Sequence, residues 1–68
     1  MKFYIGQPVF LYIYTRHQWW LGVVITDLGD DWYNVRVEVP DSDKVWDQRS
    51  SPHRMRDVDT HVALTLTR

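Results

Sequence analysis

Short runs of β-branched and aromatic residues, separated by clusters of turn-forming residues, occupy most of this chain. These residue types favour extended backbone, and no stretch of about ten residues shows a helical period. The predicted strands are residues 9–15, 19–26, 32–39, 45–49 and 61–67. Gly29, Pro40 and Pro52 interrupt the pattern, and Pro52 favours a short 3-10 turn before the last strand. The spacing predicts an all-β fold of five strands, a small barrel or sandwich.

The composition limits how this fold is stabilised. The 68 residues include four Trp, four Tyr and two Phe but no cysteine, which excludes disulfides and thiolate zinc sites. A chain of this length supports one hydrophobic core, so residues 1–68 are predicted to form a single domain. The net charge of −1 provides no general attraction to nucleic acid or to an anionic membrane.

The longest apolar run is residues 9–14, six residues against the ~20 that a membrane-spanning helix needs. Gly6 and Pro8 interrupt the N-terminal segment before a signal-peptide core can form. We therefore expect a cytoplasmic protein without a membrane partner. Residues 9–14 are also apolar on both faces of the predicted strand, and this predicts a homo-oligomer that shelters one of them.

Alternation within the strands predicts which side chains point inward. Tyr33, Val35 and Val37 share one face of the clearest strand, and in residues 19–26 the inward face is predicted to be that of Leu21, Val23 and Ile25. The predicted core comprises Val23, Ile25, Val35, Val37, Met55 and Leu64, with Tyr33 and Trp46 also pointing inward. Gly22 interrupts a bulky strand, which indicates a bend or a close approach of a neighbouring backbone.

Four segments resemble a known family. They are Gly6–Val9, Trp20–Val24, the acidic turn Asp27–Asp31 followed by Trp32–Val37, and Trp46 followed by Arg54-Met-Arg56. Their order is similar to that of the SH3-like small barrels, in the Tudor and agenet-type branch. This resemblance implies a five-stranded barrel with a 3-10 turn before its last strand. It also implies a cage of aromatic side chains that binds methylated lysine or arginine, as in Tudor-type domains.

The aromatic side chains are more numerous than so small a core can hold, so some of them are predicted to form an exposed contact surface. The predicted binding residues are Tyr14, Arg16, Trp19, Trp20, Asp30, Asp31 and Trp32. A protein or peptide partner is the first hypothesis, because the aspartates would attract a cationic side chain and repel phosphate. The sequence therefore favours a non-catalytic binding module.

Nucleic-acid binding is the alternative hypothesis. Arg49, Arg54 and Arg56 surround the predicted 3-10 turn, and arginine suits both phosphate contacts and ring stacking. Asp41, Asp43 and Asp47 precede them, and we expect ion pairs between the two groups.

We expect no catalytic, cofactor or metal site. Ser50, Ser51 and His53 are close in sequence but show no orienting acid, and the spacing of the three histidines matches no metal-ligand motif. The type II dihydrofolate reductases are SH3-like barrels that work as homotetramers, and an enzyme of that kind is the further alternative. Their Val-Gln-Ile-Tyr signature is absent, because the corresponding strand here is Val45-Trp-Asp-Gln-Arg49.

Overall fold

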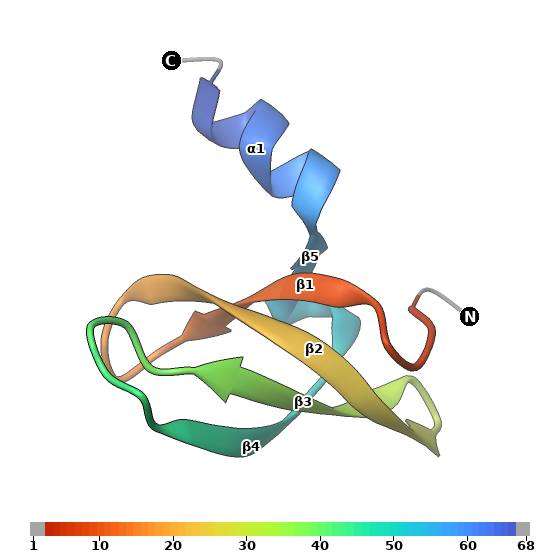
Figure 1. Ribbon diagram of the computed structural model, residues 1–68. Coiled ribbons are helices and arrows are strands. Elements are labelled where there is room, and N and C mark those ends of the chain that lie inside the picture. Colours follow the sequence, from red (N-terminus) through yellow and green to blue (C-terminus); the bar gives the residue numbers. More distant parts are fainter. Residues whose placement is uncertain (1–2, 67–68) are drawn as a thin grey trace.

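The computed structural model describes residues 3–66 and contains five strands, one 3-10 helix and one α-helix (Figure 1). The elements are β1 (Pro8–Ile13), β2 (Gln18–Gly29), β3 (Trp32–Glu38), β4 (Val45–Ser50), the 3-10 helix η1 (Pro52–Arg54), β5 (Met55–Asp57) and α1 (Val58–Leu66). The prediction of a five-stranded fold with a 3-10 turn before the last strand is confirmed.

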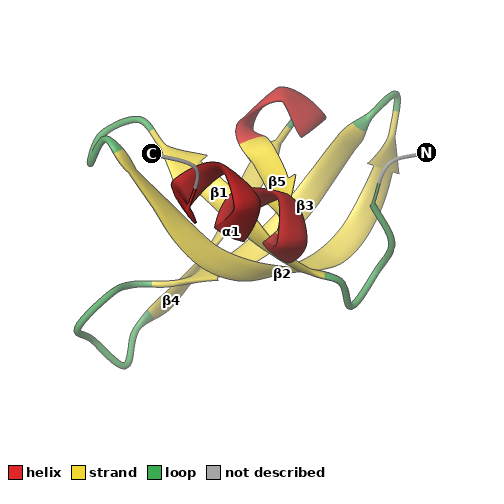
Figure 2. Cartoon of the chain, turned by 90° about the horizontal axis from the view of Figure 1, so that it is seen from above, coloured by secondary structure: helices red, strands yellow, loops and turns green. Residues whose placement is uncertain are grey.

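All five strands belong to one antiparallel sheet in the order β4-β3-β2-β1-β5. The central strand β2 pairs with β1 through its first half and with β3 through its second half. Its register shifts between Val24 and Thr26 and again between Asp27 and Gly29. Such bulges increase the local twist of a strand. The sheet is strongly curled, as the view from above shows (Figure 2), and its inner face encloses the core.

Alternate residues of the first three strands fill this core. The buried apolar side chains are Phe3, Val9, Leu11, Ile13, Trp20, Val24, Tyr33, Val35, Val37 and Met55. The inward positions predicted for Tyr33, Val35, Val37 and Met55 are therefore confirmed, and Trp46 packs partly buried against the cluster.

The predicted inward face of β2 is wrong. The structure buries Trp20 and Val24, whereas Leu21 and Val23 are about two-fifths exposed (41% and 40%) and Ile25 is half-buried. Alternation could not distinguish the faces, because both carry apolar side chains. The larger ring of Trp20 fills the core, and Val23 points outward.

Gly22 lies opposite β3, where it pairs with Val37. A Cβ atom added at Gly22 would lie 2.7 Å from the carbonyl oxygen of Arg36 and 2.9 Å from a methyl group of Val37. The predicted close approach of two backbones is confirmed, and glycine is the one residue that permits this spacing.

The strand predicted at residues 61–67 is also wrong. Residues 58–66 form α1, Leu64 is 50% exposed rather than buried, and Thr67 lies outside the described residues. The last strand is instead β5, which pairs with β1 through Met55. Asp57 then accepts a hydrogen bond from the backbone N–H of Thr60 at 2.6 Å. This capping interaction starts a helix where the alternating sequence suggested a strand.

The helix α1 rises away from the sheet above β1 and β5 (Figure 1). None of its nine residues is buried. It is the one α-helix within residues 3–66, and no helix in that range is long and apolar enough to cross a membrane.

Candidate functional site

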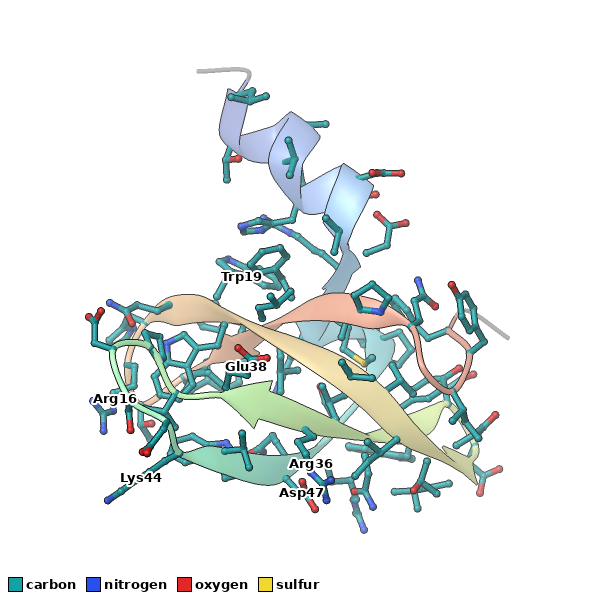
Figure 3. The ribbon with its side chains drawn as sticks, in the orientation of Figure 1. Arg16, Trp19, Arg36, Glu38, Lys44 and Asp47 are labelled. Carbon is teal, nitrogen blue, oxygen red and sulfur yellow. The ribbon has the colours of Figure 1, made fainter. Side chains whose placement is uncertain are left out.

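Aromatic side chains gather on the outer face of β1 and β2, beneath α1. Tyr12 pairs with Trp19 across the two strands, and Phe10 pairs with Arg56 of β5. Figure 3 shows Trp19 on the face of the sheet from which α1 rises. We call this region the aromatic–arginine surface, and its members are Phe10, Tyr12, Tyr14, Trp19, His61, Arg54 and Arg56.

The rings of this surface form a continuous series of contacts. Tyr12 lies between two of them, with ring centroids 5.1 Å from Tyr14 and 5.3 Å from Trp19, both in edge-to-face geometry. Trp19 in turn lies 5.7 Å from His61, whose ring stacks on Phe10 at 4.0 Å. Aromatic pairs at these separations stabilise one another beyond the area that they bury. The surface is therefore an ordered array of rings.

Two arginines lie directly over these rings. The guanidinium carbon of Arg54 is 4.1 Å from the ring centre of Tyr14, and that of Arg56 is 4.0 Å from Trp19. Neither arginine forms an ion pair with a carboxylate of residues 3–66. Their N–H groups therefore lack an anionic partner within that part of the chain.

The ion pairs predicted for the three arginines near the 3-10 turn are wrong. Asp47 pairs with Arg36 of β3 at 2.8 Å, and this interaction lowers the pKa of the Asp47 carboxyl (Figure 3). Arg49 instead lies over the ring of Trp32 at 4.9 Å. Antiparallel pairing of β3 and β4 places Arg36 directly opposite Asp47. Arg36, rather than an arginine near the 3-10 turn, therefore pairs with the Asp47 carboxylate.

The first turn of α1 closes one side of the aromatic–arginine surface. A guanidinium nitrogen of Arg56 lies 3.4 Å from Nδ1 of His61. Partial burial, and secondly the charge of Arg56, lower the pKa of His61. The docked helix therefore favours the neutral imidazole. Hydrogen bonds from Thr60 lower the pKa of the Asp57 carboxyl, so the cap requires the carboxylate form.

A hollow lies at the other end of β2. Asp30 and Asp31 form the two-residue turn between β2 and β3, with φ angles of 53° and 62°. Together with Trp32 they line a hollow of about 590 Å³. Its other lining residues are Phe3, Ser51, Pro52, His53, Met55, Arg56, Asp57 and Thr60. The carboxylates of this acidic hollow suit a cation with an apolar stem.

The structure divides the predicted binding residues between these two places. Tyr14 and Trp19 belong to the aromatic–arginine surface, and Asp30, Asp31 and Trp32 to the acidic hollow. They lie at opposite ends of β2, because Trp19 pairs with β1 at its start and Trp32 pairs with Gly29 at its end. They are therefore not brought together in one cage.

The remaining two predicted residues lie near each other, Arg16 in the turn between β1 and β2 and Trp20 at the start of β2. Trp20 is 3% exposed, so its predicted exposure is wrong. Its indole donates to Gln18, and Arg16 lies over its ring at 5.8 Å. Trp20 is buried because its position in β2, between Trp19 and Leu21, points into the core.

Sequence reasoning missed three members of the aromatic–arginine surface: Phe10, Tyr12 and His61. The signal for Phe10 and Tyr12 was present, because residues 9–14 are apolar on both faces and one face had to lie outside the core. That face was assigned to an oligomer contact. His61 could not be found while its segment was read as a strand.

Within residues 3–66 no group of three or more His, Asp or Glu side chains is arranged to hold a metal ion. No family model, curated protein or solved structure matches the chain. The resemblance to the Tudor and agenet-type barrels therefore stays a prediction.

Proposed function

We propose that the protein is a small binding module for single-stranded nucleic acid, and that the aromatic–arginine surface is its binding site. The observation that carries the proposal is the placement of Arg54 and Arg56 over rings, without a carboxylate partner in residues 3–66. Ring faces that stack on bases, combined with arginines that contact phosphates, are the means by which proteins bind single strands.

Exposure at this surface agrees with the proposal. Tyr14 is 54% exposed and Trp19 and Tyr12 are half-buried, so a base can reach their ring edges and part of their faces. An arginine on a ring leaves its N–H groups directed to the sides, where they can donate to phosphate oxygens. A bound base would add one more ring to the series of contacts in the aromatic–arginine surface.

The predicted cage residues are divided between the two ends of β2. This division weakens the first hypothesis, a peptide with a methylated or cationic side chain, at the β1–β2 end. Arg54 and Arg56 already lie over Tyr14 and Trp19, so a methylated lysine would have to displace a cation from each ring. The aspartates that were expected to repel phosphate lie at the other end of β2.

A peptide with a cationic side chain is the second candidate, and the acidic hollow is the observation that favours it. Trp32, Asp30 and Asp31 line that hollow together with the apolar side chains of Phe3 and Met55. This hollow shares Arg56 with the aromatic–arginine surface, so the two sites adjoin each other.

The test is a titration of a fluorescent oligothymidylate of about ten nucleotides, followed by anisotropy. We expect binding that weakens as salt rises from about 50 to about 200 mM, with a log–log slope near 1.4 for two phosphate contacts. A duplex of the same length should bind more weakly, because its bases are stacked within the helix. Absence of binding at about 1 mM protein, or binding without salt dependence, would contradict the proposal.

A further inference from the structure

A small hollow adjoins the aromatic–arginine surface where the end of β1 faces β4. These strands are not neighbours in the sheet, so the curl of the sheet brings them together. The hollow has a volume of about 120 Å³. It is lined by Tyr12, Ile13, Tyr14, Thr15, Trp46, Gln48 and Arg54. No carboxylate is among these residues.

Trp46, which lines this hollow, carries a hydrogen-bond donor that has no partner within residues 3–66. Its ring packs against the core, 5.1 Å from the ring of Trp20. The indole N–H of Trp20 donates to Gln18 at 3.0 Å. The indole N–H of Trp46, by contrast, is buried and has no partner in residues 3–66, and it is the one such side-chain atom there. A buried donor without an acceptor is costly, so an acceptor supplied from outside the chain recovers that cost.

The chemistry of the hollow selects the acceptor. Indole and guanidinium groups donate hydrogen bonds and cannot accept them, so Trp46 and Arg54 together require an oxygen acceptor, and the charge of Arg54 favours an anionic one. The hollow is small, about 120 Å³, and this suits a compact anionic group such as a phosphate.

We propose that this hollow is a phosphate subsite of the single strand, in which Arg54 and the indole N–H of Trp46 donate to phosphate oxygens. This inference rests on the proposed function. Arg54 and Tyr14 are both exposed and line the hollow, so their side chains can turn to admit the phosphate to the shielded N–H. Arg54 can donate to the phosphate from its place over the ring of Tyr14, because both residues line the hollow.

The test follows the four tryptophan indole N–H signals of the full chain by ¹H–¹⁵N NMR. One titration uses an oligothymidylate of about ten nucleotides, and the other uses an abasic strand of the same length, which carries phosphates without bases. We expect the Trp46 signal to move downfield and to exchange more slowly with water in both titrations. The Trp19 signal should move strongly with the base-bearing strand alone, because base stacking causes its shift.

The outcomes separate this inference from the function on which it rests. A shift of Trp19 without a shift of Trp46 overturns the subsite and leaves nucleic-acid binding in place. A Trp46 shift with oligothymidylate alone means that a base carbonyl is the acceptor, which overturns the phosphate assignment. If neither strand moves any indole signal, the proposed function itself fails.

Two substitutions provide a second measurement with a matched control. Trp46→Phe removes the N–H and keeps a ring, and we expect affinity for the abasic strand to fall about tenfold. Trp20→Phe removes an indole N–H that already has an acceptor outside the hollow, and its affinity should stay within about twofold of wild type. Should either variant unfold, Arg54→Lys keeps the charge at an exposed position and loses the planar guanidinium that donates to a phosphate in bidentate geometry. It should weaken binding about threefold or more, and unchanged affinity would count against the subsite.

Discussion

Both ends of β2 place an arginine over an aromatic ring, but the hollow at the β2–β3 end is also lined by carboxylates. At the β1–β2 end, Tyr14 and Trp19 lie beneath Arg54 and Arg56. At the β2–β3 end, Trp32 shares a hollow with Asp30, Asp31 and Asp57. The rings alone are compatible with either a base or a cation. The carboxylates beside Trp32 decide between these ligands. Trp19 and Trp32 lie at opposite ends of β2, and Arg56 adjoins both environments, because it lies over Trp19 and also lines the hollow.

The largest effect on stability should come from Gly22, which lies in β2 between the two ends. Gly22→Ala introduces a Cβ that meets the backbone of Arg36 at 2.7 Å, so β2 and β3 must separate. We expect stability to fall by about 1–3 kcal/mol. Thermal unfolding should shift by about 4–8 °C for each kcal/mol, and ligand binding at both ends should weaken together.

Leu21→Ala is the control for this substitution, because Leu21 is the neighbouring residue and points outward at 41% exposure. Its unfolding temperature should change far less. A Gly22→Ala protein as stable as the wild type would show that the two strands tolerate a wider spacing.

Removal of the two arginines should weaken nucleic-acid binding at the β1–β2 end. The double variant Arg54→Ala, Arg56→Ala loses two phosphate donors, and we expect affinity for oligothymidylate to fall about ten- to hundredfold. The log–log salt slope should decrease by about 1.4, corresponding to two phosphates. Anisotropy measured across a salt series checks both values.

Arg49→Ala is the matched variant at the other end, since Arg49 also lies over a tryptophan. Its affinity and salt slope should match those of the wild type. An equal loss in both variants would mean that general positive charge, rather than the aromatic–arginine surface, attracts the strand.

A smaller effect, an increase in stability, is expected at the β2–β3 end, which carries the acidic hollow. Asp31 has a φ of 62°, a left-handed conformation that glycine adopts without strain in two-residue hairpin turns. Asp31→Gly should therefore raise stability by about 1 kcal/mol, measured by thermal unfolding, and leave oligothymidylate binding unchanged. Asp43→Gly, in a loop without positive φ at that residue, should not stabilise the protein. A loss of nucleic-acid affinity in Asp31→Gly would place part of the nucleic-acid site at the β2–β3 end and would contradict its assignment to the aromatic–arginine surface.

The smallest effect concerns pH and the docking of α1. The pKa of His61 is lowered in the docked state, so docking favours the neutral ring. Protection of the α1 amides from hydrogen exchange should therefore be complete above the ordinary histidine pKa of about 6.5. It should decrease as the pH falls below that value. Amide hydrogen exchange of α1 measures this change. The dependence should disappear in His61→Phe, which keeps a ring against Phe10, and persist in His53→Gln.

Loss of the Asp57 cap should follow at lower pH, because hydrogen bonds from Thr60 lower the pKa of that carboxyl. Its contribution is present above the ordinary aspartate value of about 3.9 and is lost as the pH falls through the lowered value. Unchanged α1 protection down to about pH 5 would contradict the role given to His61.

Alternation predicted the strands whose two faces differ in polarity and failed where they do not. In β3, Val35 and Val37 alternate with Asn34 and Arg36, so the inward face was evident. In β2 both faces are apolar, and the size of Trp20 decided the outcome. The helix α1 was missed because Val62, Leu64 and Leu66 alternate as in a strand. The signal that overrides this pattern is local: an aspartate three residues before a backbone N–H that it caps.

Most of the residues of the candidate site could be named from the sequence, but their grouping could not. Tyr14, Trp19, Arg54 and Arg56 were all singled out. Whether an arginine pairs with a carboxylate or stacks on a ring depends on which side chain lies opposite it across the sheet, and that register became available only with the structure.

The most direct test of the central claim compares Trp19→Ala with Trp32→Ala, one ring from each end of β2. Equilibrium affinity for an oligothymidylate of about ten nucleotides is the measurement, with thermal unfolding to confirm that both variants fold. Loss of a stacking ring costs about 1–3 kcal/mol, so Trp19→Ala should bind about five- to 150-fold more weakly. Trp32→Ala should stay within about twofold of the wild type. Equal losses, or a larger loss in Trp32→Ala, would contradict the assignment of nucleic-acid binding to the aromatic–arginine surface.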